Sequence, residues 1–269
     1  MSYQPVVPMG GLAGWAFLTR TRDSQAAAFE SGARISRDTA YFEQNIANVE
    51  TAEQLVSDRR LLRVALGAFG LLDDLDNRFF IQKILEGGTQ SDDALATRLT
   101  DSRYREFADA FGFGNLGGRR TSYEGFGPEI TEKFRVRQFE IAVGEQDQSM
   151  RLAMTAERDL PEIAAGTGSD NTKWLRIMGN PPLREVFERA LGLPKEFGQQ
   201  DLDHQVEIFS ERASRQLGLD SLDQLADAAT LERVIERYLL REQVDGIAAQ
   251  SGTSIALTLL QSGPQFSGT

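Results

Sequence analysis

The sequence predicts an all-α fold: a multi-helix globular domain of short and medium helices with one long central helix. Three observations predict it. Apolar residues recur at three-and-four spacing along most of the chain, helix start and stop signals bracket these stretches, and no convincing hairpin signal interrupts them. Residues 38–85 hold the densest apolar periodicity and the clearest of these signals.

The first 22 residues are expected to be irregular, because prolines and glycines are frequent in them. Trp15, Phe17 and Leu18 are the conspicuous apolar side chains of this segment. They either dock on the core or form an anchor for a partner protein. The globular domain itself is expected to span residues 23–250.

The stretch 51–69 has the spacing of an amphipathic helix and carries signals at both ends. Thr51 followed by Gln54 fits a capping box at its start. Asp58 offers a second cap, so the stretch forms either one helix or two short ones. Gly70 stands where a helix stop needs a left-handed residue.

Three carboxylates, Asp73, Asp74 and Asp76, cluster just after this stop. A calcium loop of the EF-hand type needs a glycine at its sixth position, and counting from Asp74 that position holds Phe79. The cluster is therefore interpreted as the acidic start of the next helix, where carboxylates are favoured by the exposed amides and the helix dipole.

The long central helix is expected to start at Pro128 and to run towards Leu160, with Pro161 ending it. A polar loop follows, which makes residues 161–171 the candidate subdomain boundary. Residues 251–269 are expected to form a C-terminal tail. Further helices are expected to start near these residues: Thr172, Asn180, Asp201 and Thr230.

Composition narrows the classes of function. The chain has no cysteine and a single histidine, His204, which excludes disulfides, thiolate chemistry and multi-histidine metal sites. A net charge of −11 disfavours a nucleic-acid partner, since such partners need clustered basic side chains. No apolar run is long enough to span a bilayer, and no basic region precedes the first apolar patch, so no Sec signal peptide is expected.

Gly112, Gly114 and Gly117 form the pattern G-x-G-x-x-G, which occurs in dinucleotide-binding sites. Such a site needs the pattern between a strand and a helix. Here it follows a predicted helix, and no strand precedes it. A surface loop is therefore the favoured interpretation, and no cofactor is predicted.

Residues 61–71 and 183–193 resemble each other, with matching leucine, valine, alanine and glycine positions, and both end in Gly-Leu. A duplication of helical units would explain the match, giving two duplicated halves. The alternative is that both segments end in the same common helix stop.

Five segments of the chain resemble one protein family; they are residues 10–21, 37–71, 95–114, 137–154 and 174–194. This is an uncharacterised alphaproteobacterial domain family whose members are often described as flagellar proteins. The segment Asn45–Thr51 also resembles a short signature near the start of flagellar rod and hook proteins, although Ala52-Glu53 replaces its Pro-Gly. The resemblance implies a flagellar context and no particular reaction.

The leading functional expectation is a non-enzymatic structural or assembly protein of the flagellum that acts through helical surfaces on flagellar partners, either in the cytoplasm or in the flagellum. The alternative is a cytoplasmic chaperone or regulator of flagellar subunits. An enzyme is the third interpretation, and it requires a pocket that encloses two carboxylates. The carboxylates considered for it are Asp73, Asp74, Asp76, Asp201 and Asp203. No residue is assigned a catalytic, cofactor-binding or metal-binding role.

Overall fold

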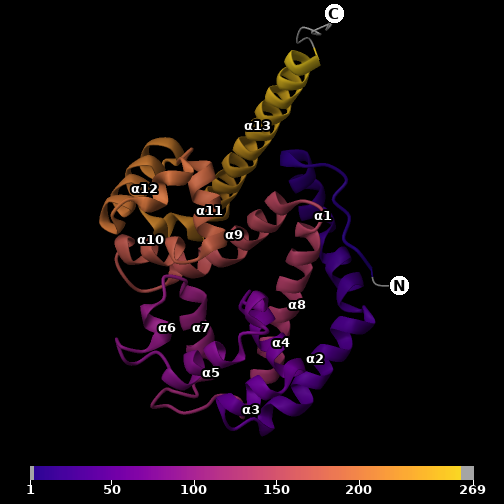
Figure 1. The fold of residues 1–269 in the computed structure, drawn as a ribbon, viewed down its shortest axis with the longest axis vertical. Coiled ribbons are helices and arrows are strands. Elements are labelled where there is room, and N and C mark those ends of the chain that lie inside the picture. The colour runs from indigo at the N-terminus through magenta and orange to yellow at the C-terminus, as the bar shows by residue number, and fades with distance from the viewer. Residues whose placement is uncertain (1–2, 262–269) are drawn as a thin grey trace, which may run out of the picture.

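The fold was analysed in a computed structural model that describes residues 3–261, and in this range all regular structure is helical, which confirms the all-α prediction. Figure 1 shows the last helix, α13 (Ala228–Gln261), projecting from the body that the other helices form. The helices of the first part are α1 (Gly11–Glu30), α2 (Ala33–Asn45), α3 (Ala52–Ser57), α4 (Arg59–Ala68), α5 (Arg78–Gly87), α6 (Leu95–Arg98) and α7 (Ser102–Phe111). Those of the second part are α8 (Phe126–Gly144), α9 (Gln148–Ala165), α10 (Asp170–Met178), α11 (Pro181–Ala190), α12 (Leu202–Leu217) and α13 (Ala228–Gln261).

Four short 3-10 helices connect these elements: η1 (Ile46–Asn48), η2 (Leu72–Asp74), η3 (Lys195–Gln199) and η4 (Leu222–Ala226). No helix among the described residues is both long and apolar enough to cross a membrane.

Most of the local signals act as predicted. Thr51 and Gln54 form the complete capping box of α3, and Asp58 accepts hydrogen bonds from two amides at the start of α4. The stretch 51–69 is therefore two helices. At its end Gly70 has a φ of +71°, and the amide of Leu71 donates to the carbonyl of Leu66 at 2.9 Å, which is the expected helix stop.

The prediction of an irregular N-terminal segment is wrong for residues 11–22, which form the first part of α1. Glycine lowers helix propensity, but packing overrides this weak preference because one face of α1 is buried through Gly14, Trp15 and Leu18. Only glycine fits at position 14, because a β-carbon there would lie 1.9 Å from the carbonyl oxygen of Met9 in the segment that precedes the helix.

The predicted long central helix is also corrected, since it consists of two helices, α8 and α9. Asp147 accepts hydrogen bonds from the amides of Ser149 and Met150 and so caps a new helix after a turn. Pro161 lies inside α9 rather than at its end. Leu160, just before it, and Ala164, three residues after it, are buried in the core, and this packing offsets the missing amide.

The C-terminal tail is corrected as well for residues 251–261, which continue α13; residues 262–269 lie outside the described range.

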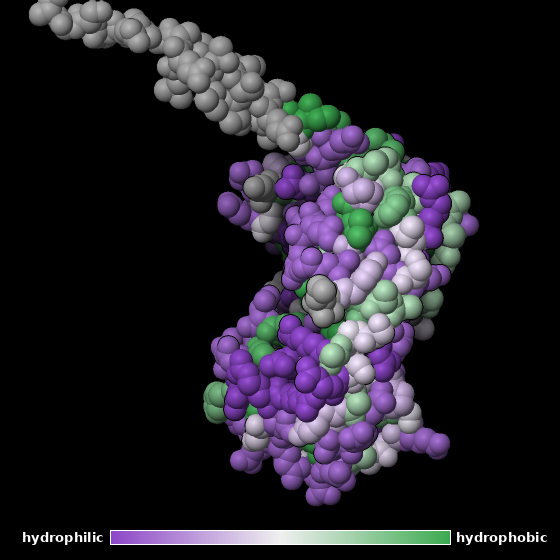
Figure 2. Space-filling view, turned by 90° about the vertical axis from the view of Figure 1, so that its right-hand side faces the viewer, coloured by the Kyte–Doolittle hydropathy of each residue, from purple (hydrophilic) through white to green (hydrophobic). Residues whose placement is uncertain are grey.

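Two hydrophobic clusters make up the core. The N-terminal cluster contains buried residues between Ile35 and Phe134, and the C-terminal cluster contains Trp15, Leu18 and buried residues between Phe139 and Leu239. The change from one cluster to the other therefore falls within α8, and the candidate boundary at 161–171 connects two helices of the same cluster. We call the parts built on these clusters the N-terminal and C-terminal lobes; Figure 2 shows the molecule narrowed between them.

The two similar segments, residues 61–71 and 183–193, end with the same hydrogen-bond pattern. The amide of Leu193 donates to the carbonyl of Glu188 at 2.8 Å, as Leu71 does to Leu66. An arginine from a neighbouring helix then donates to the last carbonyl of each helix: Arg137 to Ala68 at 2.8 Å and Arg237 to Ala190 at 3.1 Å. The shared stop accounts for the shared ending, and duplication remains a hypothesis.

Candidate functional site

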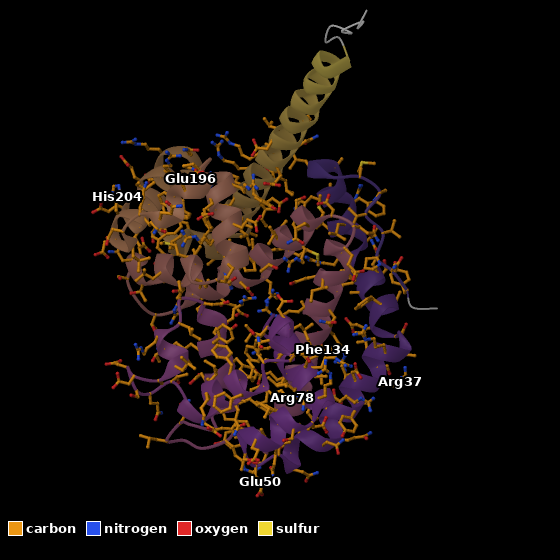
Figure 3. All side chains as sticks on the ribbon, viewed as in Figure 1. Arg37, Glu50, Arg78, Phe134, Glu196 and His204 are labelled. Atoms are coloured by element: carbon orange, nitrogen blue, oxygen red, sulfur yellow. The ribbon has the colours of Figure 1, made fainter. Side chains whose placement is uncertain are left out.

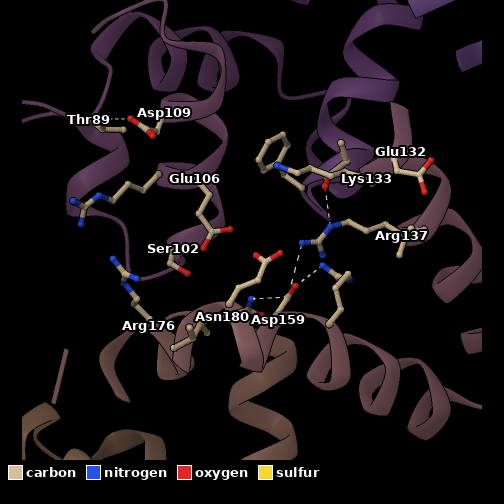
Figure 4. Close-up of a pocket in the computed structure, with 17 residues that line it drawn as sticks. Thr89, Ser102, Glu106, Asp109, Glu132, Lys133, Arg137, Asp159, Arg176 and Asn180 are labelled. Carbon is tan, nitrogen blue, oxygen red and sulfur yellow. Dashed lines mark hydrogen bonds and ion pairs between the residues drawn. The ribbon is translucent and has the colours of Figure 1, made fainter. Parts of the chain in front are cut away.

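A pocket of about 570 Å³ lies between the two lobes. We call it the interlobe pocket (Figure 4). Its N-terminal wall comes from the end of α4, from α7 and from α8, and its C-terminal wall comes from α9, α10 and the start of α11. Side chains of both charges line it: Arg105, Glu106, Asp109, Glu132, Lys133, Arg137, Arg158, Asp159, Glu162 and Arg176.

One wall of the pocket holds a connected set of ion pairs. Arg158 binds both carboxylate oxygens of Glu140, with N–O distances of 2.8 and 3.0 Å, and it also contacts Asp159. Thr155 donates a further hydrogen bond to Glu140 at 3.3 Å. Because Glu140 is buried and fully partnered in this way, its role is to hold α8 and α9 together.

Arg137 joins this network to the other lobe. Its Nε donates to the carbonyl of Ala68 at the end of α4, and its Nη2 lies 3.9 Å from a carboxylate oxygen of Asp159. Burial lowers the pKa of the Arg137 guanidinium, and the nearby Arg158 lowers it further, against the opposing effect of Asp159. A guanidinium in so desolvated a position needs polar partners, which the Ala68 carbonyl and Asp159 supply.

Glu106 projects from α7 into the pocket (Figure 4). Its carboxyl is open to solvent inside the pocket yet closely surrounded by protein, and this partial desolvation raises its pKa. Asp159 raises the pKa further and Arg137 opposes the change. A carboxyl with a raised pKa in a cleft is a common property of functional sites.

Two other polar groups of the pocket lack hydrogen-bond partners. The side-chain oxygens of Ser102 and Asn180 are both buried and unpaired, and both residues line the pocket. Ser102 is held there because its amide donates to the carbonyl of Gly179 at 2.7 Å, which joins the start of α7 to the α10–α11 turn.

The apolar side chains expected as a core contact or a partner anchor lie elsewhere. Trp15 and Leu18 are buried in the C-terminal cluster, and the indole of Trp15 donates to Glu232 of α13 at 3.0 Å. Phe17 is half-buried on α1. Trp15 and Leu18 are thus occupied by their own chain and are not available on this surface as anchors.

The five carboxylates considered from the sequence for an enzyme do not line the interlobe pocket. Asp76 pairs with Arg59 on the surface, and Asp201 caps α12 as predicted. The capping interpretation is wrong for Asp73, Asp74 and Asp76, because α5 begins after Asn77 without a side-chain cap. Asp74 instead accepts hydrogen bonds from Asn77 and from the hydroxyl of Tyr104, which fixes the η2 turn against α7.

The remaining sequence candidates stay outside the pocket too. Exposed His204 lies 3.4 Å from Glu207 on the same helix. Gly114 of the glycine-rich pattern packs against the end of α5, where a β-carbon would lie 2.4 Å from the carbonyl oxygen of Glu86. No group of three potential metal ligands is found in residues 3–261.

The sequence did not identify the pocket residues as a site, because the spacing of their charges is a weak indication of function. Charged residues do recur four apart on one helix face, as in the pairs Arg105 with Asp109, Lys133 with Arg137, and Arg158 with Glu162. Such spacing is also typical of solvated helix faces. Only the packing of α7, α8 and α9 against one another turns these faces towards a common space.

Comparisons with known proteins relate this chain to a solved structure and to a protein family. A crystal structure of a protein from Agrobacterium tumefaciens superposes with a TM-score of 0.72 and 21% sequence identity, over 90% of this chain and 99% of that chain. This similarity shows a shared fold. No curated protein matches the sequence. The family model described as "Protein of unknown function (DUF1217)" matches residues 68–231, more than half of the chain, so the chain belongs to this uncharacterised family, as the resemblance led us to expect.

Proposed function

We propose that this protein is a non-enzymatic, flagellum-associated structural or assembly protein that binds a helix of a flagellar partner through an exposed apolar face of α13. The exposed apolar stripe on α13 is the observation that carries the proposal. Leu240 and Val244 are 46% and 59% exposed, on a helix otherwise anchored deep in the C-terminal cluster.

The two parts of α13 have different surroundings. Up to Leu239 its apolar face is buried through Val234, Ile235 and Tyr238. Beyond this point Arg189 of α11 pairs with Glu242 and Asp245 and still ties the helix to the body. The helix then continues to Gln261 and projects away from the other helices (Figure 1).

The spacing of the stripe fits a helical occupant. Leu240 and Val244 follow one another at i and i+4, which places them on one face of the helix. Exposed apolar side chains in this arrangement pack against a partner helix in grooves and coiled coils. The flagellar identity of the partner is supported by the family resemblance described above.

The alternative is a cytoplasmic chaperone or regulator that uses the same stripe on unassembled flagellar subunits. Fractionation separates the two roles, because a structural component stays with purified hook–basal bodies, whereas a chaperone remains in the soluble fraction. Blotting cytosol, spent medium and hook–basal bodies, with a deletion strain as control, measures this directly. Absence from the basal bodies together with failure to co-purify any export or basal-body component would overturn the proposal.

The contribution of the stripe is tested with the double variant Leu240→Glu/Val244→Glu. We expect it to abolish co-sedimentation with purified hook–basal bodies, because two charges would have to be buried in the interface. Its melting temperature is expected to stay close to that of the unchanged protein, since both side chains are exposed. Leu116→Glu is the matched control: Leu116 is 96% exposed in the loop after α7, and its substitution should leave co-sedimentation unchanged.

A further inference from the structure

The interlobe pocket contains two buried side-chain oxygens that no group of the described chain satisfies. Asn180 is 4% exposed; its Nδ2 donates to Asp159 at 3.5 Å, while its Oδ1 has no partner. The hydroxyl of Ser102 is buried and unpaired in the same pocket. Buried polar atoms nearly always have partners, so two unpaired ones at one cavity indicate that a group from outside the chain, a water or a ligand, completes them.

Two carboxylates of the pocket have no bonded partner among the described residues. Neither Glu106 nor Glu162 makes a hydrogen bond or ion pair in the described chain. The nearest cations are already engaged, Arg137 with Ala68 and Asp159 and Arg158 with Glu140 and Asp159. A primary ammonium, which carries a positive charge and three hydrogen-bond donors, matches these two carboxylates.

Two positively charged side chains at the side of the pocket have no ion-pair partner in the described part of the chain. Arg105 from α7 and Arg176 from α10 line it, are exposed, and take part in no ion pair of the described residues. Two free guanidinium groups repel a ligand that is only cationic and attract a carboxylate, which they can bind in a bidentate manner.

We propose that the interlobe pocket binds a small zwitterion of the amino-acid class. Its ammonium lies among Glu106, Glu162, Asn180 and Ser102, and its carboxylate lies at Arg105 and Arg176. The volume of the pocket is in the range typical of small-molecule sites. Because the pocket and the α13 stripe are separate surfaces, this inference stands independently of the proposed function.

The raised pKa of Glu106 agrees with this arrangement. Partial desolvation raises that pKa first, and Asp159 and Glu162 add to the rise while Arg137 opposes it. A bound ammonium would supply a positive charge and lower the pKa again.

The test is isothermal titration of the full chain with a series of ω-amino acids from glycine to 6-aminohexanoate, with pentylamine and pentanoate as singly charged controls. We expect one or two members of the series to bind at least tenfold more tightly than either control. If no member binds at millimolar concentration, or if pentylamine binds as tightly as the best member, the proposal is wrong.

Variants identify the site. Glu106→Gln and Arg176→Gln are each expected to weaken binding by about tenfold or more, because each removes a charge-assisted hydrogen bond. Glu211→Gln, on the exposed face of α12, is the matched control and should bind as the unchanged protein does. Thermal melts confirm that each variant is folded; folded variants at Glu106 and Arg176 with unchanged affinity would overturn the assignment.

Discussion

The carboxylate of Glu140 shows most clearly how single residues hold this molecule together. It is almost fully buried between α8 and α9, and all of its partners, Arg158 and Thr155, come from α9. Asn180 and Ser102 differ from Glu140 because their buried side-chain oxygens have no hydrogen-bond partner among the described residues. Both residues line the pocket for which we infer a ligand.

We expect Glu140→Ala to destabilise the protein by about 3 kcal/mol, because it leaves Arg158 desolvated with only Asp159 as a partner. The double variant Glu140→Met/Arg158→Met is expected to lose less, since no uncompensated charge stays buried. Urea unfolding measures both. A double variant that is less stable than Glu140→Ala would show that the pair itself provides the stability.

At the scale of elements, the same type of helix stop occurs at the ends of two helices, α4 and α11. α4 and α11 both end in a left-handed glycine, with φ values of +71° at Gly70 and +62° at Gly192, and an arginine from another helix binds the last carbonyl of each. The stop thus positions Arg137 at the interlobe pocket, which links local backbone geometry to the candidate site.

Gly70→Ala and Gly192→Ala should each cost about 1–2 kcal/mol, because a side chain is strained in the left-handed conformation. The cost should be larger at Gly70, where the new β-carbon would lie 3.3 Å from Arg137; at Gly192 the nearest atom is 3.6 Å away. Gly117→Ala is the control: its φ is not positive and its β-carbon would meet nothing within 4 Å. Equal stability of all three variants in denaturant unfolding would refute this account of the stops.

At the scale of the whole molecule, two hydrophobic clusters are joined by one continuous helix. α8 contributes Phe134 to the N-terminal cluster and Phe139 to the C-terminal cluster, and the half-buried Phe29 packs against both. The interlobe pocket exists because the clusters meet along α8 and α9 and leave space between their charged faces (Figure 3 shows all the described side chains).

We expect the two lobes to unfold as one cooperative unit, because α8 cannot lose half of its packing and remain folded. Both tryptophans of the chain, Trp15 and Trp174, lie in the C-terminal cluster, so fluorescence reports on that lobe, while far-UV circular dichroism reports on all helices. The two probes should give the same urea midpoint. In Phe107→Ala, which changes only the N-terminal cluster, both midpoints should fall together; a shift in circular dichroism alone would show that the lobes unfold separately.

How much could be predicted from the sequence depended on the range of the interaction. The caps at Thr51, Asp58 and Asp201 and the stop at Gly70 were predictable, because each consists of contacts among residues within five positions of one another. The local preferences were misleading at Pro161, where a helix end was predicted, and in the glycine-rich start of α1, where irregular structure was predicted. In both places packing against distant residues stabilises a helix.

The sequence by itself thus determined that this protein is all-α, where most of its helices start and stop, and which classes of metal and thiol chemistry its composition excludes. Only the tertiary structure decided that Trp15 and Leu18 belong to the core, that the core is divided within α8, and that charged faces of α7, α8 and α9 enclose a pocket. The physical reason is that caps and stops are short-range hydrogen bonds, whereas burial and a pocket between lobes depend on which distant surfaces pack together.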